Sequence, residues 1–208
     1  MRLLLATLLI LPFSLGCNDS AVPELSTASS GTTVTPETSP SPEPAAAGGI
    51  QLTPDNTTIA FVGSHVSEEQ PDPKARHGKF KKFVGSATVT DGKLVALQLE
   101  IETSSLDTEI DDLNSHLKNA DFFDVNEHPK AKFTSTSIEE TEDGKATITG
   151  DLELLKAKKS ITFPATLNTA EGLELSADFV IDRTEFGMTY GEGKVEKEVA
   201  MSVNVSAK

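Results

Sequence analysis

The four histidines are the side chains best suited to metal binding or acid–base chemistry, and their spacing supports neither. No two of them lie three or four residues apart, and none neighbours a cysteine. Zinc and haem sites depend on such arrangements because several ligands must converge on one ion. We therefore predict no metal site and no metal or haem cofactor. The four are His65, His77, His116 and His128.

Motifs for nucleophilic catalysis and for phosphate binding are also incomplete. Ser64 precedes His65, but no Gly-x-Ser-x-Gly turn surrounds it to expose a nucleophile. Residues 191–194, Gly-Glu-Gly-Lys, lack the spacing and the following Ser or Thr of a P-loop. We therefore predict no catalytic residues and a protein that binds rather than an enzyme.

The single cysteine, Cys17, is better placed for lipid attachment than for a disulfide. The apolar run from Leu3 to Leu15 is too short to span a bilayer, which needs ~20 residues, and is typical of a signal peptide. Residues 14–17, Ser-Leu-Gly-Cys, resemble a bacterial lipobox. We predict a signal peptide over 1–16 and a lipid on Cys17. The alternative is an ordinary signal peptide with an incidental cysteine.

Residues 17–49 follow this cysteine and are mostly Ser, Thr, Pro, Ala, Gly and Glu. Such a segment buries too little apolar surface to offset its conformational entropy. We predict a disordered tether between the anchor and a domain that spans residues 50–208. The expected location is the periplasmic side of the bacterial cell envelope, with the protein exported and lipid-anchored.

The charge and the aromatic content restrict the partners of this domain. With 32 acidic and 18 basic residues, the net charge is −14, which disfavours binding to the phosphates of nucleic acids or to anionic lipid surfaces. The chain has ten Phe, one Tyr and no Trp. Phe fills apolar space without needing a hydrogen-bond partner, so it suits an apolar cavity as well as an ordinary core.

Alternation of apolar and polar residues predicts about eight short strands after residue 50. It is clear from Leu97 to Ile101, from Leu173 to Ile181 and from Val199 to Val205. Turn dipeptides such as Asp91-Gly92 separate alternating runs, as in hairpins. We therefore predict an all-β fold, an antiparallel eight-stranded β-barrel. Residues 67–75, SEEQPDPKA, are expected to form a polar loop.

One helical segment interrupts the strands. Ile110, Leu113 and Leu117 would form one apolar helical face, with Thr108 as the N-cap and Asn119 closing the helix in a left-handed conformation. The paired rings of residues 122 and 123 follow, and Pro129 prevents further helix before the next strand. A helix that ends in two aromatic residues predicts a plug or lid over the barrel.

Several motifs in this part of the chain resemble the YceI-like family. They occur in the family's order over about residues 50–208: Gly78-Lys79-Phe80, Phe83-Val84-Gly85, Ser105-Leu106-Asp107-Thr108, His116-Leu117-Lys118, Asp121-Phe122-Phe123-Asp124-Val125, His128-Pro129, Phe133-Thr134-Ser135, Gly150-Asp151-Leu152 and residues 181–187, IDRTEFG. The resemblance implies a lipocalin-like barrel that binds a polyisoprenoid lipid, of the quinone or polyprenyl phosphate type. With the predicted lipid anchor, this leads to the hypothesis of a membrane-tethered carrier or store for that lipid.

The expected lining of that barrel consists of inward Phe and aliphatic residues: Phe61, Phe80, Phe83, Leu97, Leu99, Leu117, Phe122, Phe123, Phe133, Phe163 and Phe179. Arg183 is either a polar clamp on the ligand head group or a corner residue that bonds backbone carbonyls. The competing hypothesis is an envelope stress-related or protein-interaction module whose barrel is filled by its own side chains. The expected partners are the isoprenoid lipid, the membrane and, as a further candidate, a second copy of the chain in a homodimer.

Overall fold

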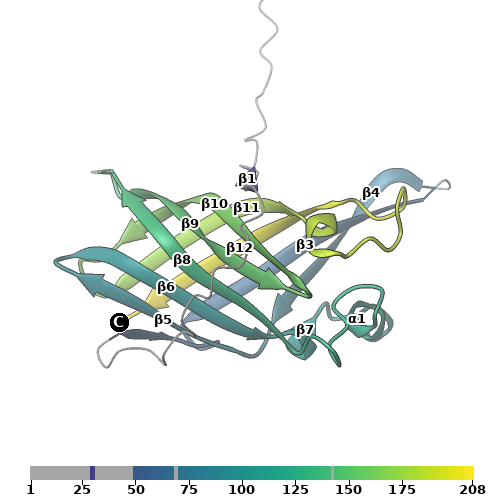
Figure 1. Ribbon diagram of the computed structural model, residues 1–208, viewed down its shortest axis with the longest axis horizontal. Helices are drawn as coiled ribbons and strands as arrows, with labels where there is room; N and C mark the ends of the chain where they lie inside the picture. The colour runs from purple at the N-terminus through teal and green to yellow at the C-terminus, as the bar shows by residue number, and fades with distance from the viewer. Residues whose placement is uncertain (1–28, 31–48, 68–69, 142) are drawn as a thin grey trace, which may run out of the picture.

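The computed structural model describes residues 29–30, 49–67, 70–141 and 143–208 and is an all-β protein with one short helix (Figure 1). The long strands are β3 (Thr57–Ser67), β4 (Gln70–Phe80), β5 (Phe83–Thr90), β6 (Lys93–Glu102), β8 (Lys130–Glu140), β9 (Lys145–Leu154), β10 (Ala157–Asn168), β11 (Leu173–Asp182) and β12 (Glu198–Ala207). The short elements are β1 (Ser29–Ser30), β2 (Ile50–Leu52), β7 (Leu106–Asp107), the helix α1 (Asp111–Lys118) and the 3₁₀ turns η1 (Thr103–Ser105) and η2 (Arg183–Phe186).

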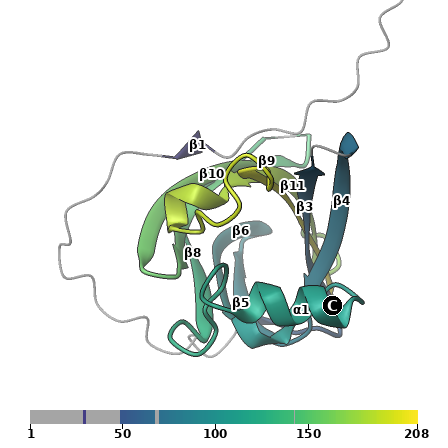
Figure 2. The ribbon, with the colours of Figure 1, turned by 90° about the vertical axis from the view of Figure 1, so that its right-hand side faces the viewer.

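All these strands belong to one antiparallel sheet. Its order is β2-β5-β6-β8-β9-β10-β11-β12-β3-β4-β7, and β1 pairs with β10 beside this path. The last strand therefore pairs with one of the first, with Met201 opposite Phe61. The sheet curls strongly on itself, and α1 and the loop from η2 to β12 lie at the same end of it (Figure 2).

The predicted antiparallel all-β fold with one inserted helix is confirmed, but the eight-stranded count is wrong. The sheet has twelve strands in the described residues, and its pairing order ends at β2 and β7 instead of closing into a ring. The largest omission is β4, which begins inside the predicted loop over 67–75. Its sequence has no apolar alternation, and its two prolines are tolerated because only β7 pairs with its far edge, at Lys79 and Phe80.

The alternating pattern does place its apolar residues inside. On β11, Leu173, Leu175, Ala177, Phe179 and Ile181 are all buried, while the residues between them are half-buried or exposed. The hairpin turn before β6 also forms as expected, since Asp91 and Gly92 both have positive φ, at 52° and 75°.

The helix forms within the predicted region and ends at Asn119 as expected, but the predicted N-cap and the predicted left-handed conformation of Asn119 are wrong. Ile110 is the N-cap residue and makes no side-chain cap bond, whereas Thr108 hydrogen-bonds to Asn114 instead. Asn119 is extended, with φ −75° and ψ 173°, and the left-handed residue is Asp124, at φ 43°. The chain can turn at Asp124 because Asp tolerates the left-handed region better than most residues.

The predicted signal peptide, Cys17 and nearly all of the predicted linker lie outside the described residues. Ser29 and Ser30 are the exception within 1–48, and they pair with Thr162 and Ile161 of β10. Within the described residues, no helix has the length and apolar character needed to cross a membrane.

Candidate functional site

A cavity of about 380 Å³ lies next to α1, which contributes to its lining. Its walls come from seven strands and include Ile101 on β6, Ala131 on β8, Leu152 on β9, Ile181 on β11 and Met201 on β12. Ligand pockets in proteins usually measure ~300–1,000 Å³ and are mostly apolar, with a few polar groups that orient the ligand. This cavity meets both criteria.

The packed interior begins one layer below the cavity. Phe133 and Phe179 each lie two residues along their strands from a wall residue, so they point to the same side of the sheet. The Phe163 ring stacks on Phe179, with centroids 4.2 Å apart and planes at 12°, and lies 5.7 Å from Phe133. These three rings close off the apolar space below the cavity.

Two aromatic groups line the open end of the cavity. Phe80 contacts Phe61 and Phe123, with ring centroids 5.6 and 5.8 Å apart. A second group joins α1 and its following turn to the loop before β12.

In that second group the ring of His116 lies edge-on to Phe122 and to Tyr190, both at 5.1 Å, and Phe122 lies 5.4 Å from Tyr190. Because α1 contributes Leu113, His116 and Leu117 to the cavity lining, the helix covers part of the opening. The position agrees with the predicted lid.

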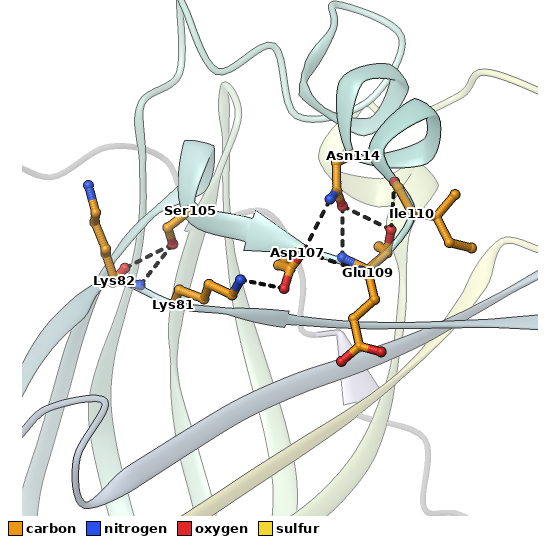
Figure 3. Close-up of polar contacts among 8 residues, drawn as sticks. Lys81, Lys82, Ser105, Asp107, Glu109, Ile110 and Asn114 are labelled. Carbon is orange, nitrogen blue, oxygen red and sulfur yellow. Dashed lines mark hydrogen bonds and ion pairs between the residues drawn. The ribbon is translucent and has the colours of Figure 1, made fainter.

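Polar contacts to Asp107 hold α1 in this position (Figure 3). One carboxylate oxygen of Asp107 pairs with the Lys81 ammonium at 2.6 Å, and the other accepts from the Glu109 N–H at 3.2 Å and from Asn114 Nδ2 at 3.1 Å. Asn114 in turn accepts from the Thr108 N–H at 2.7 Å. The Lys81 bond and the Glu109 N–H lower the pKa of Asp107 to about 2. The carboxylate therefore stays charged and links β4, β7 and the helix.

Arg183 is almost fully buried and lines the cavity, but its guanidinium bonds mainly to the backbone of the loop before β12. It donates to the carbonyls of Glu196, at 2.9 Å, and Val195, at 2.8 Å, and to that of Met188. Burial lowers the pKa of Arg183 and the adjacent Asp182 opposes that effect, so the guanidinium remains protonated. This geometry agrees with the corner role of Arg183.

The structure divides the predicted lining residues into two groups of equal size. Those that line the cavity are Phe61, Phe80, Leu117, Phe122, Phe123 and Arg183. Those that are buried in the packed interior and do not line the cavity are Phe83, Leu97, Leu99, Phe133, Phe163 and Phe179.

Some cavity residues were not predicted from the sequence. Ile181 and Met201 belong to alternating strands, so a pattern signal existed for them. Tyr190, Lys194 and Arg76 had no such signal, because they belong to a Gly-rich loop and to the unpredicted β4. Within the described residues, no group of three or more His, Cys, Asp or Glu side chains is placed to hold a metal ion.

Comparison with known proteins now identifies the family. The family model of the YceI-like domain matches residues 51–207. This chain belongs to the YceI-like domain family. It is 32% identical over 139 residues to a UPF0312 protein of Pseudomonas putida, covering 62% of this chain and 71% of that protein. It is 38% identical over 93 residues to protein YceI of Shigella flexneri, covering 44% of this chain and 48% of that protein.

Solved structures of similar fold agree with this assignment. BcnA of Burkholderia cenocepacia superposes with a TM-score of 0.63 at 23% identity, covering 72% of this chain and 94% of BcnA. A polyisoprenoid binding domain from Saccharophagus degradans superposes with a TM-score of 0.57 at 14% identity, covering 76% of this chain and 97% of that domain. At these identities the likeness establishes the YceI-like fold.

Proposed function

We propose that this protein binds the chain of an isoprenoid lipid in the cavity under α1. The observation that carries the proposal is the cavity itself, lined by apolar side chains from most of the strands and covered at its open end by two groups of aromatic rings. The printed name of the Saccharophagus degradans domain, a polyisoprenoid binding domain, supports the same class of ligand.

Apolar contact is expected to supply most of the binding free energy. Each buried methylene contributes ~0.8 kcal/mol, so about ten buried carbons contribute roughly 8 kcal/mol before the loss of chain freedom is subtracted. A Kd near 1 μM corresponds to a net free energy of about −8 kcal/mol and therefore requires more than ten buried carbons. Longer chains would extend through the open end, where the rings of Phe123 and Tyr190 lie.

We further propose that the domain works as a tethered carrier or store. In this proposal residues 1–16 are removed on export, Cys17 is lipidated and residues 17–49 tether the domain to the membrane. A flexible chain of about 30 residues has a typical reach of roughly 30 Å, and the pairing of Ser29–Ser30 with β10 shortens that reach. The cavity would then remain close to the membrane from which an isoprenoid is taken. Mass spectrometry of the N-terminal peptide tests the lipid on Cys17, and an unmodified cysteine would contradict this part.

The binding proposal is tested by the lipid content of the purified protein. Val199 lies half-buried on the cavity wall, whereas Val95 is 53% exposed on β6. Organic extraction and mass spectrometry of the unaltered protein should yield an isoprenoid in near-equal amount to protein. Val199→Trp should lose it, because the indole fills the cavity, and Val95→Trp should retain it. An empty protein that takes up neither added quinones nor polyprenyl phosphates would overturn the proposal.

The alternative, an interaction module with a filled barrel, is favoured by one observation. The Phe133, Phe163 and Phe179 rings belong to one continuous core of buried side chains that fills the sheet below the cavity. The cavity at the other end argues against complete filling. A protein without lipid but with a stable partner, whose binding survives Val199→Trp, would favour this alternative.

A further inference from the structure

The charged residues of the cavity are basic in excess, against the balance of the whole chain. The chain has 32 acids and 18 bases, but the cavity is lined by Arg76, Arg183 and Lys194 against the single acid Glu196. The guanidinium of Arg183 already donates hydrogen bonds to three backbone carbonyls. Arg76 and Lys194 form no ion pair among the residues that the structure describes.

The register of β3 and β4 determines where Arg76 lies. Phe61 pairs with Gly78, and its ring occupies the space where a Gly78 side chain would be, so this face of the hairpin is the inner one. Two residues further out, Gly63 pairs with Arg76. Because residues two apart on a strand share a face, Arg76 lies on the inner face, just beyond the phenylalanine rings.

The inner wall next to Arg76 is bare. A side chain built on Gly63 would meet no atom within 4 Å, and the backbone of Gly63 does not need positive φ. Open space therefore lies on the inner face at Gly63, the residue that pairs with Arg76, and both residues line the cavity.

The loop that carries Lys194 is fixed against the other edge of β3. The Val66 N–H donates to the Lys194 carbonyl at 2.7 Å, the Glu196 N–H donates to the Ser64 carbonyl at 2.9 Å, and Val195 forms an isolated bridge with His65. Arg183 holds the same loop from the inside through the Val195 and Glu196 carbonyls. The outer end of β3 is thus flanked by Arg76 on one side and by Lys194 on the other.

We infer that the mouth of the cavity is a binding site for an anionic head group, with Arg76 as its main contact and Lys194 as the second. It rests on the proposed function and narrows it: the ligand is a single-chain lipid that ends in a phosphate or a carboxylate, in preference to a neutral quinone or alcohol. The chain lies in the apolar cavity, and the head group lies over Gly63. A guanidinium donates to either anion through two N–H groups at once.

The test compares lipids with the same chain and different ends, by displacement of the neutral fluorescent probe N-phenyl-1-naphthylamine from the full chain. Geranylgeranyl phosphate should displace the probe at about tenfold lower concentration than geranylgeraniol, as one charge-assisted contact implies. High salt should narrow this difference, since the site is open to solvent. Palmitate and hexadecanol form the second pair, and their comparison shows whether the site also prefers a carboxylate to an alcohol.

Variants assign the preference to the site. Arg76→Gln should bring the phosphate to within about twofold of the alcohol without changing alcohol binding, and Arg76→Lys should retain part of the preference. Gly63→Val fills the open space and should weaken the phosphate more than the alcohol. Lys79→Gln removes the same charge from the outer face of β4 and should change neither lipid.

Three outcomes separate the two proposals. An Arg76-dependent preference for the phosphate alone, or for both the phosphate and the carboxylate, supports the inference. The result also shows which of the two head groups the site binds. If each anionic lipid binds as tightly as its alcohol, and Arg76→Gln and Gly63→Val change neither, the inference is overturned. The proposal that the cavity binds a lipid chain is then unaffected. Failure of all four lipids to displace the probe from a folded protein counts against the lipid cavity itself.

Discussion

The two ends of the curled sheet use the same alternating pattern for different purposes. At one end the inward side chains touch one another, and Leu52, Ile148 and Leu173 have no exposed surface. At the other end the inward residues Leu152, Val199 and Met201 remain half-buried, because they face a cavity. The comparison shows that the fold is stabilised mainly by the packed end, so the cavity end is free to exchange contacts with a ligand.

The strongest test of this difference is the loss of a ring from the packed end. Phe163→Ala removes the ring between Phe133 and Phe179 and should lower the free energy of unfolding by ~3–5 kcal/mol. Urea titration followed by circular dichroism measures the loss. If Phe163→Ala lowered the free energy of unfolding by less than a truncation at the cavity wall, the packed end would not be the main source of stability.

Arg183→Ala should have the next largest effect and should lower both stability and lipid content. The substitution removes the guanidinium donor from the buried Met188 carbonyl and from the partly buried Val195 and Glu196 carbonyls, and we expect roughly 3 kcal/mol less stability together with loss of lipid. Arg183→Lys should rescue little, because an ammonium cannot reach three diverging carbonyls. A stable Arg183→Ala protein that has lost only its lipid would instead favour the head-group clamp.

Truncation of a side chain at the cavity wall should have a small effect on stability and a larger effect on lipid content. Met201→Ala removes contacts from a side chain that is already half-buried, so the cost in unfolding free energy should be only about 1 kcal/mol. Its lipid content, measured by extraction and mass spectrometry, should fall because the wall becomes less complementary. If Met201→Ala kept its full lipid content and a folded Phe163→Ala protein contained none, the ligand would lie at the packed end of the sheet and not in the cavity.

The smallest expected effect is a pH dependence confined to the lid. The pKa of Asp107 is lowered from its ordinary value, near 3.8, to about 2, so the folded protein favours the charged carboxylate. The stability that it contributes is present above pH 4 and is lost as the pH falls toward 2. Amide exchange of α1 should accelerate in that window and that of β11 should not. Asp107→Asn should remove the pH dependence while leaving the sheet intact.

The sequence predicts strand faces better than it predicts strand neighbours. Leu97, Leu99 and Leu175 were all expected to point inward, and all are buried. Strand β4 was not expected, because its inner positions carry Gly78 and Arg76 instead of apolar residues. The N-cap of α1 was also mispredicted, since Asn114 binds Thr108 and Asp107 in contacts that local propensity cannot foresee.

The sequence by itself determined the all-β class, the inserted helix and the family, because alternation, turn dipeptides and ordered motifs are local properties of the chain. Its prediction of a lipidated Cys17 also rests on local pattern alone. Only the tertiary structure decided which inward residues line the cavity. A period of two tells whether a side chain points inward, but the distance along the barrel axis depends on register and curl. For the same reason Phe123 lines a cavity and Phe133 packs below it, although both are Phe in one motif-rich stretch.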